Sequence, residues 1–123
     1  MQTSVREITT YQTGVQAEQT VAAYLRRKGF SLLAMRFRTE AGEIDLVVNK
    51  GEVIHFIEVK RRRSLAEARQ CISVRQRQRI AKAAEIFLAQ QPEEREWISQ
   101  FDAVFVVGKT LHWLPDAWRV EDL

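Results

Sequence analysis

The sequence has little that would place the protein in an oxidising compartment or in a membrane. Its single cysteine, Cys71, cannot form a disulfide within the chain. No apolar run approaches the roughly 20 residues that a membrane-spanning helix needs. The first residues, MQTSVREITTYQTG, lack the apolar stretch of a secretory signal. We therefore expect a soluble, cytoplasmic protein with no membrane partner.

Internal repeats and low-complexity tracts are also absent, and neither sign of charge dominates strongly. The 123 residues suit one compact domain, and the 46% that are apolar are enough for a buried core. Charged residues make up 28% and leave a net charge of +3, which is a weak indication of a polyanionic partner. The positions of the charges therefore carry more information than their sum.

Periodicity and turn residues divide the chain into a polar N-terminal arm, residues 1–13, and a single domain, residues 14–123. The arm is expected to be flexible, with a folded or exchanged segment as the alternative. The predicted helices cover residues 14–28, ending at Gly29, and residues 73–90. The predicted strands cover residues 30–37, 43–48, 53–60, 99–107 and 110–114. A basic loop over 61–71, with room for one helical turn, and an irregular tail after Pro115 complete the chain.

The order α-β-β-β-α-β(-β) predicts an α/β fold. The first three strands can form a meander, and a strand that follows the long second helix can pair in parallel with one of them. We expect a mixed sheet flanked by helices.

Three polar residues on the central strands form the main candidate site. Side chains alternate between the faces of a strand, so Glu58 and Lys60 share the face of Ile54 and Phe56. On the preceding strand Asp45 is expected to share a face with Glu43 and Val47, whereas Ile44, Leu46 and Val48 take the other. A hairpin turning near residues 49–51 brings Asp45 to the level of Glu58.

Two carboxylates at this spacing repel each other unless a cation lies between them. Mg²⁺ and Mn²⁺ prefer such oxygen ligands, and Lys60 could position or activate an attacking water. Glu18 falls on the buried face of the first helix with Val21 and Leu25, so it could add a third metal ligand. The alternative is that Glu18 is a buried acid paired with an arginine.

The segment GEIDLVVNKGEVIHFIEVKRR, residues 42–62, resembles the Asp…Glu-x-Lys motif of restriction-endonuclease-like nucleases. With GVQAEQTVAAYLRRKGF and FDAVFV, residues 14–107 resemble the YraN-like family of bacterial proteins within that superfamily. The resemblance implies a restriction-endonuclease-like sheet, with Asp45 and Glu58 as metal ligands and Lys60 as a catalytic residue. It also implies that Glu18 lies at the edge of the site.

The second long helix departs from the family pattern, which commonly has a lysine near its start. Here Gln76 takes that place on the inward face with Ile80 and Phe87. A glutamine on this helix could help to hold the site, as in other branches of the superfamily. Gln76 could equally cap the helix or bind a loop.

Basic residues follow the candidate site and are expected to contact a nucleic-acid backbone, although such runs are also common on solvated faces. These residues are Arg61, Arg62, Arg63, Arg69, Arg75, Arg79 and Lys82, with Arg77 between them. Asp102 is read as a structural acid, His55 as structural because it faces away from Glu58, and the three tryptophans as packing residues.

Three hypotheses follow. The first is a nuclease that uses Mg²⁺ or Mn²⁺ to hydrolyse phosphodiester bonds in DNA or RNA, with DNA favoured and a homodimer as one arrangement. The second is a nucleic-acid-binding or scaffold protein that keeps the nuclease fold without turnover. The third is a protein–protein adaptor built on the tryptophan-rich C-terminal part.

Overall fold

A computed structural model describes residues 3–7, 14–69, 71–92 and 96–123. Its elements in chain order are β1 (Thr3–Glu7), α1 (Gly14–Arg27), β2 (Ser31–Arg38), β3 (Glu43–Lys50), β4 (Val53–Arg62), α2 (Leu65–Arg69), α3 (Val74–Ala89), β5 (Ile98–Val107), β6 (Thr110–Trp118) and the 3₁₀ helix η1 (Val120–Asp122). The predicted succession from the first helix to the last strand is confirmed.

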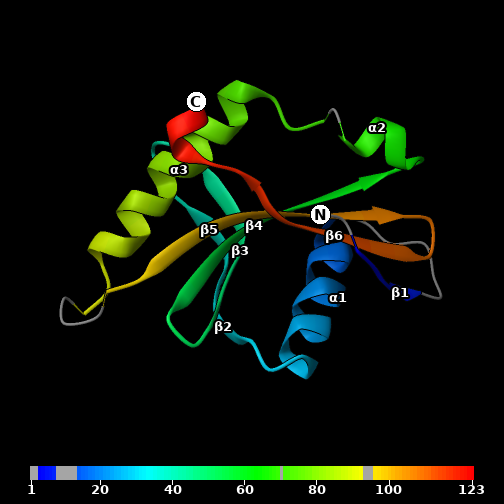
Figure 1. Cartoon of the computed structure of the whole chain (residues 1–123), viewed down its shortest axis with the longest axis horizontal. Helices are drawn as coiled ribbons and strands as arrows, with labels where there is room; N and C mark the ends of the chain where they lie inside the picture. The colour runs from blue at the N-terminus through cyan, green and yellow to red at the C-terminus, as the bar shows by residue number, and fades with distance from the viewer. Residues whose placement is uncertain (1–2, 8–13, 70, 93–95) are drawn as a thin grey trace.

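The strands form one six-stranded sheet in the order β1-β6-β5-β4-β3-β2 (Figure 1). β4 and β5 are parallel, with Glu58 opposite Ala103, and every other neighbouring pair is antiparallel. The parallel pair is joined through α2 and α3, which form the expected crossover. The predicted mixed sheet flanked by helices is therefore confirmed.

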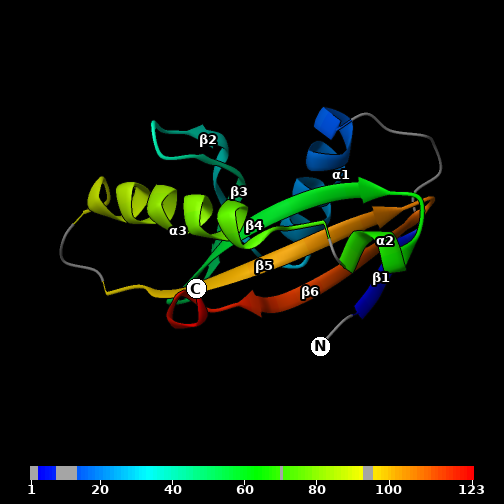
Figure 2. The ribbon, with the colours of Figure 1, turned by 90° about the horizontal axis from the view of Figure 1, so that it is seen from above.

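Helices cover both faces of the sheet and define two hydrophobic cores. α1 packs Ala17, Val21 and Leu25 against one face, which includes Leu46 and Ile57. α2 and α3 cover the other face, where Ile80, Ala84 and Phe87 meet Ile54 and Phe56. Figure 1 shows α1 below the sheet and the other two helices above it. Figure 2 shows that α2 and α3 lie over different ends of their shared face.

The N-terminal arm is the first correction, because its residues 3–7 are folded, which is the alternative to the flexible arm that was expected. Residues Thr3–Glu7 form β1, which pairs antiparallel with β6 from Thr3 opposite Trp113 to Glu7 opposite Thr110. The polar composition of the segment hid this strand. β6 offers an edge of unpaired backbone groups, and pairing satisfies them whatever the side chains are. Residues 1–2 and 8–13 of the expected arm lie outside the described residues.

The C-terminal tail is the second correction, because β6 continues past Pro115 to Trp118 instead of ending at residue 114. The register with β5 shifts between Phe101 and Ala103, and Asp116 has a positive φ of 53°. Proline has no backbone N–H to donate, so a bulge is where a strand can accommodate it. The basic loop is also shorter than expected, since β4 extends through Arg62. The helical turn that the loop was expected to allow is α2.

Candidate active site

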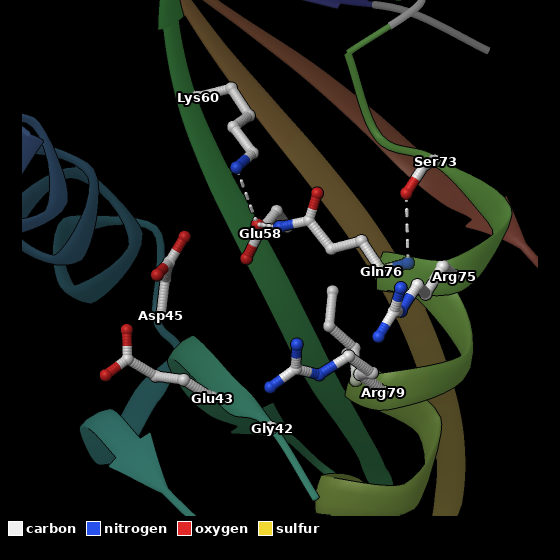
Figure 3. Close-up of a pocket in the computed structure, with 10 residues that line it drawn as sticks. Gly42, Glu43, Asp45, Glu58, Lys60, Ser73, Arg75, Gln76 and Arg79 are labelled. Carbon is white, nitrogen blue, oxygen red and sulfur yellow. Dashed lines mark hydrogen bonds and ion pairs between the residues drawn. The ribbon is translucent and has the colours of Figure 1, made fainter.

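A pocket of about 410 Å³ lies between the start of α3 and the strands β3 and β4 (Figure 3). Its walls combine acidic and basic side chains with apolar surface. The lining residues are Gly42, Glu43, Asp45, Glu58, Lys60, Ser73, Arg75, Gln76, Arg79 and Ile80. Four of the five residues predicted to form the catalytic site, namely Asp45, Glu58, Lys60 and Gln76, are thus brought together in one cavity.

β4 supplies the acid and the lysine from one face, as period two predicts. The Lys60 ammonium Nζ lies 3.1 Å from the Glu58 carboxylate Oε2. Glu58 is only 4% exposed, whereas Lys60 is partly open to the pocket. A buried carboxylate needs compensating partners, and Lys60 is the first of them.

Gln76 is the second partner, because its side-chain amide Nε2 donates a hydrogen bond to Glu58 Oε2. The residue sits in the first turn of α3, where its backbone N–H donates to the Ser73 hydroxyl at 3.1 Å. Ser73 is the N-cap of the helix and fixes where that turn begins. The side chain of Gln76 therefore holds the site, and only its backbone takes part in capping.

Asp45 sits where β3 separates from β4. The ladder between these strands ends at Leu46 opposite Ile57, and the Asp45 carboxylate Oδ2 instead accepts a hydrogen bond from the Val59 backbone N–H at 2.8 Å. The side-chain alternation breaks at this residue, since Ile44 joins Val47 in the α3-side core. The expectation that Ile44 shares the face of Leu46 and Val48 is therefore wrong.

Glu18 approaches the same acids from α1, on the other side of Asp45. It is 6% exposed, and its Oε1 lies 3.7 Å from Arg36 Nε. Glu18 is not among the residues that line the pocket. Glu18 is thus a buried acid with an arginine neighbour, as the alternative expected, and it also lies beside Asp45. Its role as a third metal ligand stays a prediction.

The closeness of Asp45 changes the proton affinity of the two buried glutamates, Glu58 and Glu18. Burial, followed by the charge of Asp45, raises the pKa of Glu58 to about 8, although Lys60 acts in the opposite direction. Burial and Asp45 likewise raise the pKa of Glu18 to about 7, against a lowering by Arg36. Like charges held together in a desolvated place behave in this way, and perturbed acids of this kind cluster at functional sites.

The donor set fits a hard divalent cation. Its atoms are carboxylate oxygens, and Glu18 Oε1 is buried without a hydrogen-bond partner among the described residues. In the described part of the chain, no three acidic, histidine or cysteine side chains are arranged as a ready-made cage. Mg²⁺ commonly binds one or two carboxylates with water and substrate phosphate, and Asp45 and Glu58 could provide this.

The predicted basic run is divided by the fold. Arg75 and Arg79 line the pocket from α3, and Lys82 is exposed one turn further along. On β4, successive residues alternate between faces, so Arg62 follows Lys60 on the α3 side while Arg61 lies on the α1 side.

The remaining arginines of the run take other positions. Arg63 is exposed in the bend after β4, and the side chain of Arg69 lies outside the described residues. The Arg77 guanidinium lies 5.8 Å from the Trp118 ring centre.

A second buried polar cluster on the α1 face confirms the structural reading of Asp102 and His55. Asp102 is fully buried and lies 2.7 Å from His55 Nδ1 through its Oδ2. It also accepts hydrogen bonds from Gln100, from the Trp113 indole and from the Asp116 backbone. With His55 on β4, these partners on β5 and β6 join three neighbouring strands at one carboxylate.

The tryptophans contribute to packing. Trp118 stacks on Phe101, Trp113 contacts Phe30 edge to face, and Trp97 packs against the α3-side core.

Sequence reasoning missed three residues around the site. Gly42 fits so tightly against α3 that a Cβ would lie 2.8 Å from the Arg79 carbonyl oxygen. Glu43 lines the pocket beside Asp45 and binds Arg38. Arg36 lies near Glu18 and has a positive φ of 51°. The GEID segment pointed to Gly42 and Glu43, but nothing in the sequence pointed to Arg36.

The described helices include none that is long and apolar enough to cross a membrane.

Comparison with known proteins places the chain in a family. The model of a family described as "Uncharacterised protein family UPF0102" matches residues 17–106. A UPF0102 protein of Bradyrhizobium diazoefficiens is 43% identical over 108 residues, which is 88% of this chain and 81% of the relative.

Two further relatives with the same description agree with this placement. One from Rhodopseudomonas palustris strain HaA2 is 44% identical over 104 residues, 85% of this chain and 81% of the relative. One from Azorhizobium caulinodans is 48% identical over 93 residues, 76% of this chain and 71% of the relative. This protein belongs to the UPF0102 family, the YraN-like family that its motifs predicted.

Proposed function

We propose that the protein is a metal-dependent nuclease that hydrolyses phosphodiester bonds in DNA. The observation that carries the proposal is the convergence of Asp45, Glu58 and Lys60 in one pocket whose rim holds Arg75 and Arg79. This chemistry needs three kinds of group: acidic side chains that bind a cation, an amine that orients a water, and basic side chains that contact the phosphate backbone.

Asp45 and Glu58 would hold the cation. When bound, Mg²⁺ or Mn²⁺ would neutralise phosphate charge and make a bound water more acidic. The hydrogen bond from Val59 to Asp45 fixes one oxygen of that carboxylate and leaves the other available. Gln76 and Lys60 both contact Oε2 of Glu58, so Oε1 is the oxygen without a contact to either of them.

Lys60 would orient the attacking water and balance charge at the phosphate. Its ammonium is held by Glu58 at 3.1 Å and is partly exposed to the pocket, so a water at its open side would lie next to the carboxylates. Arg75 and Arg79 are exposed on the same rim and would position the backbone of the nucleic acid, as guanidinium groups do.

The test is a cleavage panel of single-stranded, duplex and four-way-junction DNA and of RNA, each with Mg²⁺, with Mn²⁺ and with EDTA. We expect metal-dependent cleavage of at least one DNA form. Loss of at least a hundredfold in rate is expected for Glu58→Gln and for Lys60→Met. Lys109→Met, the same change at an exposed turn, should leave the rate unaltered.

Absence of cleavage in every combination would contradict the proposal. Equal cleavage by Glu58→Gln would assign the activity to a contaminant.

A second candidate is a nucleic-acid-binding protein that has kept this site without turnover. Two observations favour it. Glu58 is engaged by both Gln76 and Lys60, and the described residues include no group of three acidic, histidine or cysteine side chains that forms a metal cage. Salt-sensitive binding to DNA, with no cleavage under any metal, would select this candidate.

A further inference from the structure

Arg36 has an unusual backbone for its residue type. Its φ of 51° lies in the left-handed region, which glycine adopts freely and asparagine tolerates but which strains other side chains. Such strained residues persist where the surrounding structure imposes them, and they concentrate at functional sites. Within β2 a left-handed residue interrupts the regular alternation of side chains.

The strain lies directly opposite Asp45. β2 and β3 pair with Met35 opposite Leu46 and Phe37 opposite Ile44, so the register places Arg36 across from Asp45. Both strands change face at this pair, since Phe37 and Ile44 pack together in the α3-side core while Leu46 belongs to the α1 side. The distortion thus involves one residue on each strand and frees both side chains from the regular pleat.

The contact made by Arg36 is with Glu18. Its Nε lies 3.7 Å from Glu18 Oε1, which has no hydrogen-bond partner in the described part of the chain. The Glu18 side chain is 8% exposed and that of Arg36 is 38% exposed. The guanidinium therefore acts on the buried carboxylate through charge and from the solvent side.

We propose that Arg36 is a positioning residue, a built-in cation that neutralises Glu18 and competes with a divalent metal for it. This inference rests on the proposed function, because it concerns the same group of acids. The lowering of the Glu18 pKa by Arg36 supports it. Arg36 would thereby reduce the affinity of the site for a free cation.

Replacing Arg36 should change the affinity for a divalent metal, and the direction of the change separates a competing cation from a structural residue. If Arg36 had a purely structural role, its replacement would weaken metal binding, because the acids would lose their arrangement. A competing cation would do the reverse, since its removal leaves Glu18 free and takes one positive charge out of the site. An ion pair exposed on one side is weak, so the expected change is about three- to tenfold.

The measurement is Mn²⁺ affinity of the full chain at pH 8 and low salt, read from the electron paramagnetic resonance signal of free Mn²⁺. Arg36→Asn removes the charge and keeps a residue that tolerates the backbone, and we expect it to bind Mn²⁺ about three- to tenfold more tightly. Arg36→Lys keeps the charge and should stay within about twofold of the unaltered protein. Arg26→Gln removes a charge from the exposed end of α1 and should change nothing.

Weaker or unchanged Mn²⁺ binding by Arg36→Asn would overturn the inference. If the unaltered protein binds Mn²⁺ through Asp45 and Glu58 while Arg36→Asn has no effect, the nuclease proposal survives and only the competing role fails. If neither the unaltered protein nor Arg36→Asn binds Mn²⁺, both fail. Thermal unfolding provides a separate check on the strain, because Arg36→Gly should melt above Arg36→Ala, the reverse of the usual order in a strand.

Discussion

Glu58 and Glu18 are acids that the fold holds at a cost, because each is buried near Asp45. Their raised pKa values, about 8 and about 7, mean that the folded metal-free protein binds protons that the unfolded chain, with a value near 4.5, releases. The slope of stability with pH follows from this difference in bound protons. Between pH 4.5 and 8 the folded state binds more protons, so this contribution lowers stability as pH rises.

The first prediction is therefore that the EDTA-treated protein loses stability as pH rises from about 5 to 8. The loss should be smaller in Glu58→Gln, which has no charge to develop at that position. Mn²⁺ should raise the melting temperature more at pH 8 than at pH 6, because it replaces protons at the acids. Urea denaturation at several pH values gives the stabilities. A Glu58→Gln curve parallel to that of the unaltered protein would contradict the electrostatic account.

At this scale the sequence allowed prediction of part of the site. Period two on β4 was enough to pair Glu58 with Lys60, and the hairpin turn placed Asp45 at their level. Helical projection found the inward direction of Gln76 and Glu18. Arg36 could not be predicted because its role depends on a left-handed backbone, which neither composition nor periodicity indicates.

The turn between β2 and β3 locks against α3 and forms one wall of the pocket. Thr39 closes the turn, since its hydroxyl accepts from the Ala41 and Gly42 backbone N–H groups at 3.0 Å. Arg79 Nε donates to the Ala41 carbonyl at 3.2 Å from the helix side. Because Gly42 has no side chain, the turn can pack directly against the backbone of α3. The distance between α3 and the acids therefore depends on this glycine.

The second prediction concerns this contact. Gly42→Ala would place a Cβ 2.8 Å from the Arg79 carbonyl oxygen, a backbone atom that cannot turn aside. We expect a loss of about 1–3 kcal/mol in the free energy of unfolding, as for other overpacked sites, together with weaker Mn²⁺ binding. Urea denaturation measures the first effect. Gly14→Ala is the control, because a Cβ there meets nothing within 4 Å. If Gly42→Ala has the same free energy of unfolding and the same Mn²⁺ affinity as the protein without the substitution, the turn can shift without cost and the prediction is wrong.

Helices and strands whose ends are marked by particular residues were predicted well. Strands that form only because a neighbouring strand offers backbone hydrogen bonds were not. α1 ends before Gly29, whose φ of 95° suits a helix stop, and α3 begins after Ser73, whose hydroxyl caps it. β1 and the end of β6 have no such signals. Each exists because a neighbouring strand offers backbone partners, and a bulge at Asp116 absorbs the register shift past Pro115.

The net charge of the whole molecule is too small to account for nucleic-acid binding unless basic side chains gather on one part of the surface. The net charge is +3, while Arg75 and Arg79 lie on the pocket rim above the α3-side core and α1 covers the opposite face (Figure 1). Each phosphate neutralised by a basic side chain adds about 0.9 to the salt dependence of duplex binding. Nucleic acid is therefore expected to bind on the α3 face of the sheet.

The third prediction follows from this asymmetry. Arg75→Gln should weaken binding to duplex DNA and reduce the slope of log affinity against log salt by about 1. Arg26→Gln removes the same charge from the opposite face and should alter neither quantity. Fluorescence anisotropy at several salt concentrations, with EDTA present to prevent cleavage, provides the slopes. Equal slopes for all three proteins would place the DNA elsewhere.

The central claim is that Asp45 and Glu58 jointly bind one divalent cation, and anomalous diffraction from crystals soaked in Mn²⁺ tests it most directly. The account predicts an anomalous peak in the α3 pocket within about 2.0–2.3 Å of an oxygen of each carboxylate, absent in crystals of Asp45→Asn. No peak at these residues under saturating Mn²⁺, or a peak that persists unchanged in Asp45→Asn, would contradict it.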